Sequence, residues 1–468
     1  MFQVLWRRAV LACLVAMPGA GWAAQAAPPS VAAVFSPPYQ QQLLMQIEVA
    51  LARVQARHGI IPQAAADEIA RTANLEAVPP AAVAERRKKV GHPMVALIDT
   101  WADATRDGAG EWIHYGATTQ DIYDTAQVMQ LRQAVAIMIQ QMRQAEEAML
   151  ALARQHRDTP MIGRTVGRHA LPITFGLKVS SWLAENRRNI ERLKSWHART
   201  NTGMLSGAVG SYAALGDQAF QIEAEVMREL GLGQPWPADW KGSKDMFAEY
   251  GALLAISAKT WGRIGQEVFI LQGDDIRELE DPSDSVGSST MPHKVNPSYS
   301  RSVVQYSRVV PHEAEILLDW MISIHERDQI SNADVLGQVS VSMDKLLKAA
   351  VPMVQKLRVF PANMRRNLDR TNGLIMAEHA MFVLGQKVGK HTAHEEVRLA
   401  AREAWDNGTT LLEAIRRRPA LAPHVDELDL ASQLDPARYT GLSAQATDRA
   451  VAEIERARKA DYPDSPAR

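Results

Sequence analysis

Hydrophobic side chains recur every three or four residues along a central stretch of the chain. From Val128 to Leu152 the apolar positions are spaced 3-4-3-4-3-4-3, a heptad pattern held for more than three repeats. Such a seam predicts a long helix that packs against at least one other long helix. Its positions are Val128, Leu131, Val135, Met138, Met142, Ala145, Met149 and Leu152.

The same helical spacing and composition continue through much of the chain. Four further stretches read as long helices, at residues 170–198, 246–279, 296–326 and 331–357. We find no convincing alternation with a period of two over the length of a strand. The pattern therefore predicts an all-α fold whose middle part is a bundle of unusually long helices.

Clusters of proline and glycine divide the predicted helical sequence into three parts. We expect an N-terminal helical domain at 27–123, a central long-helix domain at 124–358 and a C-terminal helical domain at 359–468. A length of 468 residues accommodates about two or three domains, in keeping with this division.

The first 26 residues differ from the rest and have the layout of a secretory signal peptide. Arg7 and Arg8 are the only charged residues before Glu48, and a short apolar run and small residues follow them. The run is too short to span a bilayer. We therefore predict cleavage after Ala23 or Ala26 and a periplasmic or secreted protein, with no membrane association after the signal is removed.

Composition narrows the functional classes. The chain is 46% hydrophobic and 22% charged, with a net charge of −1, so nothing indicates binding to nucleic acid or to an anionic membrane. The only cysteine, Cys13, lies in the predicted signal, so the mature chain has no thiol for a disulfide, a zinc site or nucleophilic catalysis. Metal-ligand clusters, P-loops and dinucleotide fingerprints are not recognisable, and we expect no metal or organic cofactor.

Four polar segments interrupt the helical pattern, and three of them have ordinary explanations. His92 before a proline could be a surface or capping group, Thr119 could cap a helix, and His169 could be a buried core histidine. The fourth segment, GSSTMPHKVNP at 287–297, is more specific, because no cap or turn needs these residue types in that order. The segments are 91–98, 113–125, 163–176 and 286–298.

Residues 287–297 closely resemble the signature loop of the fumarase/aspartase superfamily, and the other polar segments follow in that superfamily's order. Residues 43–69 look like the N-terminal helices of adenylosuccinate lyases and carboxymuconate cycloisomerases, and residues 371–397 look like their C-terminal domain. The resemblance implies a three-domain fold, a homotetramer with a central helical bundle, and active sites built from three subunits.

The resemblance also assigns catalytic roles. Ser288 would be the base that removes a proton beside a carboxylate, acting as an alkoxide or nearly so. The product of that step carries two negative oxygens, which fixed cations and donors must stabilise as the charge develops. Lys294 and Asn296 would supply that stabilisation. The expected substrate-binding residues are His92, His114, Thr118, Thr119, Thr165, Arg168, His169, Ser289, Met291, Arg301 and Arg327.

The sequence departs from the pattern of the succinyl-adduct lyases in an instructive way. Those enzymes have a histidine as general acid where this chain has Val166, and a glutamate partner for it where this chain has Arg301. Because both members of the pair are replaced, we expect a different acid or none. Arg168 or His169 would then assist on the leaving-group side, and Arg301 would pair with an extra carboxylate of the substrate.

A second departure concerns the nucleotide. Arg327 matches the HERD segment of adenylosuccinate lyases, but the later phosphate-binding arginine is Leu336, which argues against a substrate linked to AMP. The cycloisomerases have a Trp-x-x-x-Arg-Asp stretch; here Trp240 is kept, but their arginine is Lys244.

Three functional hypotheses follow. The leading one is an exported lyase that performs β-elimination, or the reverse addition, on a small polycarboxylate, with C–N cleavage and release of fumarate. The second is a lactonising enzyme like 3-carboxy-cis,cis-muconate cycloisomerase. The third is a non-catalytic binding tetramer, against which the intact Ser288, Lys294 and Asn296 weigh.

Overall fold

A computed structural model describes residues 30–236, 241–283, 287–328 and 334–461 of the chain. These residues form two compact units, each assembled from three separate stretches of sequence. Unit 1 comprises the described residues within Met1–Gln141, Asn189–Lys259 and Tyr306–Leu347, and unit 2 those within Met142–Arg188, Thr260–Gln305 and Lys348–Arg468. The domain boundaries expected from the sequence stay predictions.

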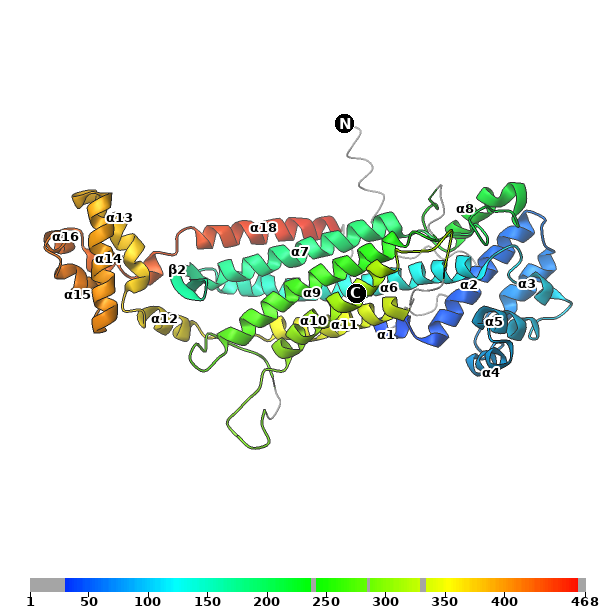
Figure 1. Ribbon diagram of the computed structural model, residues 1–468, viewed down its shortest axis with the longest axis horizontal. Coiled ribbons are helices and arrows are strands. Elements are labelled where there is room, and N and C mark those ends of the chain that lie inside the picture. The colour runs from blue at the N-terminus through cyan, green and yellow to red at the C-terminus, as the bar shows by residue number, and fades with distance from the viewer. Residues whose placement is uncertain (1–29, 237–240, 284–286, 329–333, 462–468) are drawn as a thin grey trace. The chain divides into compact units, whose positions relative to one another are not determined.

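Five long helices contribute residues to both units, and they confirm the predicted all-α fold (Figure 1). Every residue of the heptad seam lies on the first of them and is at least 91% buried. The long helices are α6 (Thr119–Gln155), α7 (Phe175–Thr200), α9 (Asp245–Leu271), α10 (Tyr299–Asp319) and α11 (Asp334–Gln355).

Unit 1 also contains helices that lie entirely within it, in addition to its parts of the five long ones. Two buried tryptophans in its core make hydrogen bonds. Trp101 donates to Thr72 Oγ1 at 2.9 Å, and Trp196 donates to the carbonyl of Met246 at 2.9 Å. Its other helices are α1 (Val31–Val34), α2 (Pro37–Arg57), α3 (Gln63–Thr72), α4 (Pro80–Val90), α5 (Pro93–Ala102), η3 (Ala109–Trp112), η4 (Gly216–Gln218) and α8 (Ala219–Glu229).

Unit 2 contains an antiparallel hairpin, β1 (Pro160–Thr165) and β2 (Arg168–Thr174), that the sequence analysis did not predict. Val166 and Gly167 connect the strands with φ of 49° and 72°, the left-handed pair that a two-residue turn requires. The register slips by one residue after Gly163, where a Cβ atom would meet the Leu171 carbonyl oxygen at 2.8 Å.

The C-terminal helices of unit 2 form a separate apolar core, to which Ile162 of β1 also belongs. A two-residue pairing of β3 (Leu279–Glu280) with β4 (Arg358–Val359) leads into them. The helices that contribute to this core are α12 (Pro361–Asp369), η5 (Leu374–Met376), α13 (Ala377–Val388), α14 (Lys390–Asn407), α15 (Leu411–Arg416), α16 (Ala422–Glu427) and α17 (Leu430–Gln433). They are followed by η6 (Pro436–Arg438) and α18 (Ser443–Asp461).

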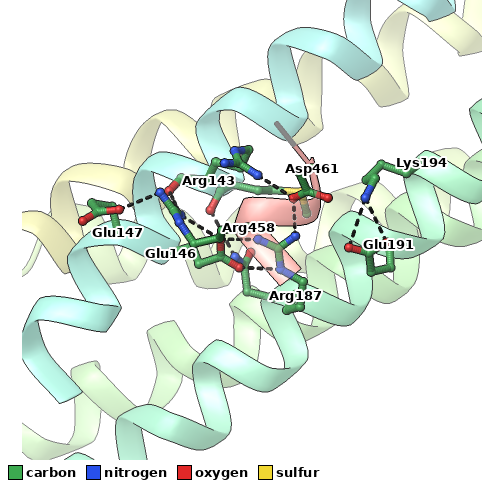
Figure 2. A network of polar contacts seen from close by, with 10 residues as sticks. Arg143, Glu146, Glu147, Arg187, Glu191, Lys194, Arg458 and Asp461 are labelled. Atoms are coloured by element: carbon green, nitrogen blue, oxygen red, sulfur yellow. Dashed lines mark hydrogen bonds and ion pairs between the residues drawn. The ribbon is translucent and has the colours of Figure 1, made fainter. Parts of the chain in front are cut away.

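Helix α18 is fixed to its neighbours by a buried network of charges (Figure 2). Arg187 of α7 donates through Nε to Glu146 of α6 at 2.8 Å and through Nη1 to Asp461 at 2.5 Å. Arg143 also reaches Asp461 at 2.5 Å, and Arg458 reaches Glu146 at 2.7 Å. Because each buried carboxylate has more than one cationic partner, none of these charges is left uncompensated.

The predicted helix limits need correction at several ends. The stretch expected as helix from residue 170 begins with strand β2, and the helix proper starts at Phe175. The helix expected to reach residue 279 ends at Leu271, and the one expected at 296–326 covers only Tyr299–Asp319. The end at Leu271 precedes Gly273, Asp274 and Asp275, and the start at Tyr299 follows Pro297 and Ser298, which are residue types that favour turns.

Candidate active site

The serine loop, residues 287–298, arranges the predicted base so that its oxygen accepts hydrogen bonds. Ser288 Oγ accepts from the backbone N–H groups of Thr290, at 3.2 Å, and Met291, at 2.9 Å. Both donors are fixed by the turn of the backbone rather than by mobile side chains. Hydrogen bonds to an oxygen that becomes negative favour its ionised form, so this turn lowers the cost of forming a serine alkoxide.

The two ends of the serine loop lie close together, with Gly287 against the backbone of Lys294 and Asn296. The Asn296 side-chain amide donates to the carbonyl of Gly287. A Cβ atom on Gly287 would lie 2.1 Å from the carbonyl oxygen of Lys294 and 2.3 Å from the nitrogen of Asn296, so only glycine fits this position. Asn296 therefore also has a structural role, which the sequence analysis did not anticipate.

The helix that follows the loop is anchored by a buried acid. Asp281, 3% exposed, accepts from the backbone N–H groups of Ser300 at 2.6 Å and Tyr299 at 3.4 Å. A carboxylate at this helix end satisfies otherwise unpaired donors. Asp281 thus fixes where the serine loop ends and α10 begins.

The side chains expected to meet the substrate lie on the outside of the loop. Ser289, Met291 and Lys294 are exposed, with Met291 at 42%. Among the described residues Lys294 makes no ion pair or side-chain hydrogen bond. Its ammonium group is therefore available to an anionic ligand.

In unit 1, His114 is held by a buried glutamate that the sequence analysis missed. Its Nδ1 lies 2.6 Å from Oε1 of Glu48, which is 1% exposed, and its φ of 66° is in the left-handed region. Burial lowers the pKa of His114, but attraction to Glu48 and then Asp121 outweighs it, and the pKa is raised. An isolated carboxylate in the buried face of α2 was the signal available in the sequence.

The start of α6 positions the two predicted threonines. The backbone N–H of Thr118 donates to Asp121 at 2.9 Å, and Thr119 is the first residue of the helix, so Thr118 rather than Thr119 occupies the capping position. Asp121 is fully buried and also accepts from Lys241 Nζ at 2.8 Å. Both threonine hydroxyls lack hydrogen bonds to the described residues and are therefore open to a ligand.

Lys244, which replaces an arginine of the cycloisomerase pattern, has a structural partner. Its Nζ donates to Asp124 at 2.5 Å and lies 5.3 Å from the ring centroid of Trp320. Burial raises the pKa of Asp124 and the nearby Lys244 opposes that rise. The lysine therefore anchors α9 to α6 inside unit 1.

His92 has the ordinary role considered for it. It is exposed and caps α5, with Nδ1 accepting from the backbone N–H of Val95 at 3.3 Å. This capping contact occupies one ring nitrogen, and the other can still meet a ligand.

The hairpin of unit 2 carries Thr165, Arg168 and His169, all of them exposed. Because His169 is exposed, it is not the buried core histidine considered from the sequence. Partial burial of its ring, followed by the nearby Arg164, lowers its pKa. Val166 at the tip is fully exposed, which is unusual for a branched apolar side chain with positive φ. The Val166 side chain is therefore fully open to solvent, and at this position it cannot act as the acid that a histidine would provide.

The remaining predicted residues are distributed between the units. Arg301 is exposed in the first turn of α10 in unit 2, and Arg327 is partly buried in unit 1. Trp240 and the predicted signal peptide lie outside the described residues. Unit 1 holds His92, His114, Thr118, Thr119 and Arg327, and unit 2 holds Thr165, Arg168, His169, Ser288, Ser289, Met291, Lys294, Asn296 and Arg301.

Two further properties of the described residues concern metal ions and membranes. Within the described ranges, no group of three or more His, Cys, Asp or Glu side chains is arranged to bind a metal ion. In the same part of the chain, none of the helices combines the length and apolarity needed to cross a bilayer.

Comparison with protein families gives two matches that together cover most of the chain. Residues 25–311 match a family model described as Lyase, and residues 373–450 match one described as Adenylosuccinate lyase C-terminus. The second match coincides with the C-terminal helices of unit 2.

Characterised relatives are similar over nearly their whole length. An N-acetyl-S-(2-succino)cysteine lyase of Enterococcus italicus is 35% identical over 87% of this chain and 90% of the relative. An adenylosuccinate lyase of Methanocaldococcus jannaschii is 34% identical over 90% and 93%. The solved 3-carboxy-cis,cis-muconate lactonizing enzyme of Pseudomonas putida is 29% identical, covers 91% and 97%, and superposes with a TM-score of 0.84.

Proposed function

The chain belongs to the fumarase/aspartase superfamily of lyases, and from that membership we propose that it eliminates a β-substituent from a small polycarboxylate. The bond broken joins carbon to nitrogen, and the unsaturated product is fumarate. The enzyme works as a homotetramer with sites shared between subunits, and it is exported through the signal predicted at residues 1–26. Membership in a family of lyases argues against the non-catalytic binding tetramer.

In this reaction the alkoxide of Ser288 takes a proton from the carbon next to a carboxylate. The electron pair left on carbon moves into that carboxylate, and Lys294 and Asn296 stabilise the resulting negative oxygens. The pair then returns to form the C=C bond while the leaving group departs and takes up a proton. Water exclusion by the serine loop strengthens each of these interactions.

The observation that carries the proposal is the pair of backbone N–H groups that donate to Ser288 Oγ. A serine in water is too weak a base for a carbon acid. Two fixed donors, together with an exposed ammonium group on the same loop that has no partner in the described part of the chain, provide the stabilisation that a serine base requires.

The substrate is proposed to lack a nucleotide. Leu336, at the position expected for a phosphate-binding arginine, is 1% exposed and belongs to the core of unit 1. A buried leucine there cannot bind a phosphate. The similarity to a succinocysteine lyase makes a C–S bond of a succinyl adduct the nearest variant of the proposed C–N cleavage.

A second candidate function is cyclisation of a carboxylated muconate. The observation that favours it is Val166 at the exposed hairpin tip, because that reaction does not use the histidine that Val166 replaces. The fold similarity to the lactonizing enzyme is compatible with either reaction.

Turnover assays with purified protein distinguish these functions. We expect fumarate absorbance to rise with N-(2-succinyl) adducts of amines or amino acids, and Ser288→Ala to abolish that rise. Ser181→Ala, which removes an exposed hydroxyl bonded to Lys178 within α7, serves as the matched control and should retain turnover. Turnover of S-(2-succinyl) thiols alone would move the bond to C–S, turnover of carboxymuconate alone would favour cyclisation, and activity that survives Ser288→Ala would refute the mechanism.

A further inference from the structure

Unit 2 contains a cavity of about 740 Å³ between the hairpin and the C-terminal helices. Cavities of this volume accommodate small organic ligands. Apart from Arg168 and His169, its lining falls outside the residues predicted to bind substrate. The lining consists of Arg164, Gly167, Arg168, His169, Asp275, Ile276, Asn367, Arg370, Thr371, Asn372, Leu374, Ile375, Ala404, Trp405 and Gly408.

Two arginines in this lining have no carboxylate partner among the described residues. Arg168 makes no ion pair, and Arg370 donates through Nη1 only to the backbone carbonyl of Asp275 at 3.1 Å. Asp275 is the one acidic residue in the described lining. Two guanidinium groups against one carboxylate leave an excess of positive charge.

The third arginine is already neutralised and fixes one wall. Arg164 forms a two-pronged ion pair with the fully buried Glu278, at 2.8 and 3.0 Å. Asn367 donates to the same carboxylate at 2.9 Å, while its Oδ1, in a side chain 5% exposed, has no partner. This wall is rigid, and it retains one unused acceptor for a hydroxyl or a water molecule.

The positive charge acts on His169. Burial is the largest cause of its lowered pKa, and Arg164, Arg168 and Arg370 each lower it further, while Glu278 opposes them. A histidine surrounded by cations loses its proton readily, so at neutral pH it is a neutral donor or acceptor. A bound anion would reverse the effect and raise its pKa.

One side of the cavity is apolar, and this side favours an organic ligand over an inorganic anion. Ile276, Leu374 and Ile375 line it, and the Trp405 ring is 62% exposed. The guanidinium carbon of Arg168 lies 5.7 Å from the centroid of that ring. A ligand with a carbon skeleton buries this surface, whereas a phosphate ion does not.

We propose that this cavity is a binding site for a small organic carboxylate, whose carboxylate accepts hydrogen bonds from Arg168 and Arg370 while its carbon skeleton packs against Trp405. Guanidinium groups match carboxylates in planar geometry, and the charge strengthens each hydrogen bond. Binding here is a property of unit 2 and does not depend on which bond the enzyme cleaves.

Isothermal titration of the full-length protein with propane-1,2,3-tricarboxylate tests the site. We expect Arg370→Gln to weaken binding by roughly tenfold or more, because a charge-assisted hydrogen bond is lost. Arg366→Gln, in the last turn of α12 before Arg370 but not in the cavity lining, is the matched control and should bind like the parent protein. Unchanged melting temperatures would confirm that both variants are folded.

A second measurement distinguishes this site from any other that binds carboxylates. The tricarboxylate should raise the pKa of His169, followed by its ring proton resonance, in the parent protein but not in Arg370→Gln. Equal affinity of Arg370→Gln and Arg366→Gln, or no change at His169, would overturn the proposal. Inorganic phosphate binding as tightly as the tricarboxylate would overturn the assignment to an organic ligand.

Discussion

His114 Nδ1 lies 2.6 Å from Oε1 of Glu48, which is 1% exposed and whose Oε2 has no hydrogen-bond partner among the residues that the structure describes. Helix α2, which carries Glu48, also holds Tyr115, the residue after His114, because Gln55 donates to the Tyr115 carbonyl at 2.7 Å. A neutral imidazole that donates from Nδ1 to Glu48 keeps Nε2 as an acceptor, and a protonated one offers Nε2–H to a ligand. Glu48 therefore sets the protonation state that His114 presents to a substrate.

Replacing Glu48 by glutamine should make stability depend less on pH. The folded-state pKa of His114 is raised, so the pair contributes stability that is fully present below about pH 6.5 and is lost as pH rises through the raised pKa. We expect Glu48→Gln to lose about 1–3 kcal/mol at acidic pH and less at alkaline pH. Urea unfolding at a series of pH values measures this difference.

Gln55→Met is the control for that experiment. It removes an uncharged hydrogen bond to the same loop, so its cost should be constant with pH. If the two variants showed parallel pH profiles, His114 and Glu48 would not be an ion pair in solution.

Gly287→Ala should sharply reduce activity while leaving the rest of the fold intact. The added Cβ would collide with the backbone at Lys294 and Asn296, which must then move apart. We expect kcat/KM to fall by about 10²-fold or more, since small displacements of catalytic groups are costly. Gly273→Ala, whose nearest new contact is 3.3 Å, should remain active. Near-parental activity of Gly287→Ala would mean that the close approach of Gly287 to Lys294 and Asn296 is not needed for turnover.

Val166→Asn should stabilise the protein, because asparagine tolerates a positive φ that strains a β-branched residue. We expect a gain of about 1 kcal/mol in the free energy of unfolding. Strain retained at an exposed position indicates a function, so turnover should decrease. Thermal unfolding and kcat/KM, measured on one preparation, test both parts, and unchanged turnover would contradict a functional role for Val166.

Arg187→Met should be strongly destabilising. It leaves Glu146 and Asp461 inside the protein with part of their positive partners removed (Figure 2). Breaking a buried ion pair from one side costs about 3–5 kcal/mol. Chemical denaturation and proteolysis of α18 report the loss. Arg398→Met, which breaks an exposed pair with Glu395, should change stability little, and a similar loss in both variants would contradict the buried network.

Mixing two inactive variants tests whether sites are shared between subunits. His114 lies in unit 1 and Ser288 in unit 2. We propose that a site shared between subunits takes these two residues from different chains. We expect Ser288→Ala and His114→Ala, each inactive alone, to regain part of the activity after joint unfolding and refolding. Light scattering on the same sample gives the number of subunits. A mixture that stays inactive would place both residues in one chain.

The long helices could be predicted from sequence because their signal is repeated. Each residue from Val128 to Leu152 in the seam falls on the same buried stripe, so an error at one position changes little. Helix ends and the hairpin could not be predicted in this way. They depend on single residues such as Gly163 and Val166, whose effect is visible only when the opposing backbone is in place.

The serine loop was identified by the order of its residues, but its internal bonding was not. The donors to Ser288 are backbone groups of Thr290 and Met291, which carry no side-chain signal. Glu48 was missed for another reason, since it lies 66 residues from His114 and a lone acid in a helix usually faces solvent.

The chain passes between its two compact units five times, at the boundaries after residues 141, 188, 259, 305 and 347. Neither unit can therefore be excised as one continuous fragment, expressed separately or exchanged with a relative by a single recombination event. A nascent chain must wait for its last 121 residues before unit 2 is complete. Exchange of a whole unit with a relative would therefore require three separate segments of the gene to be replaced together.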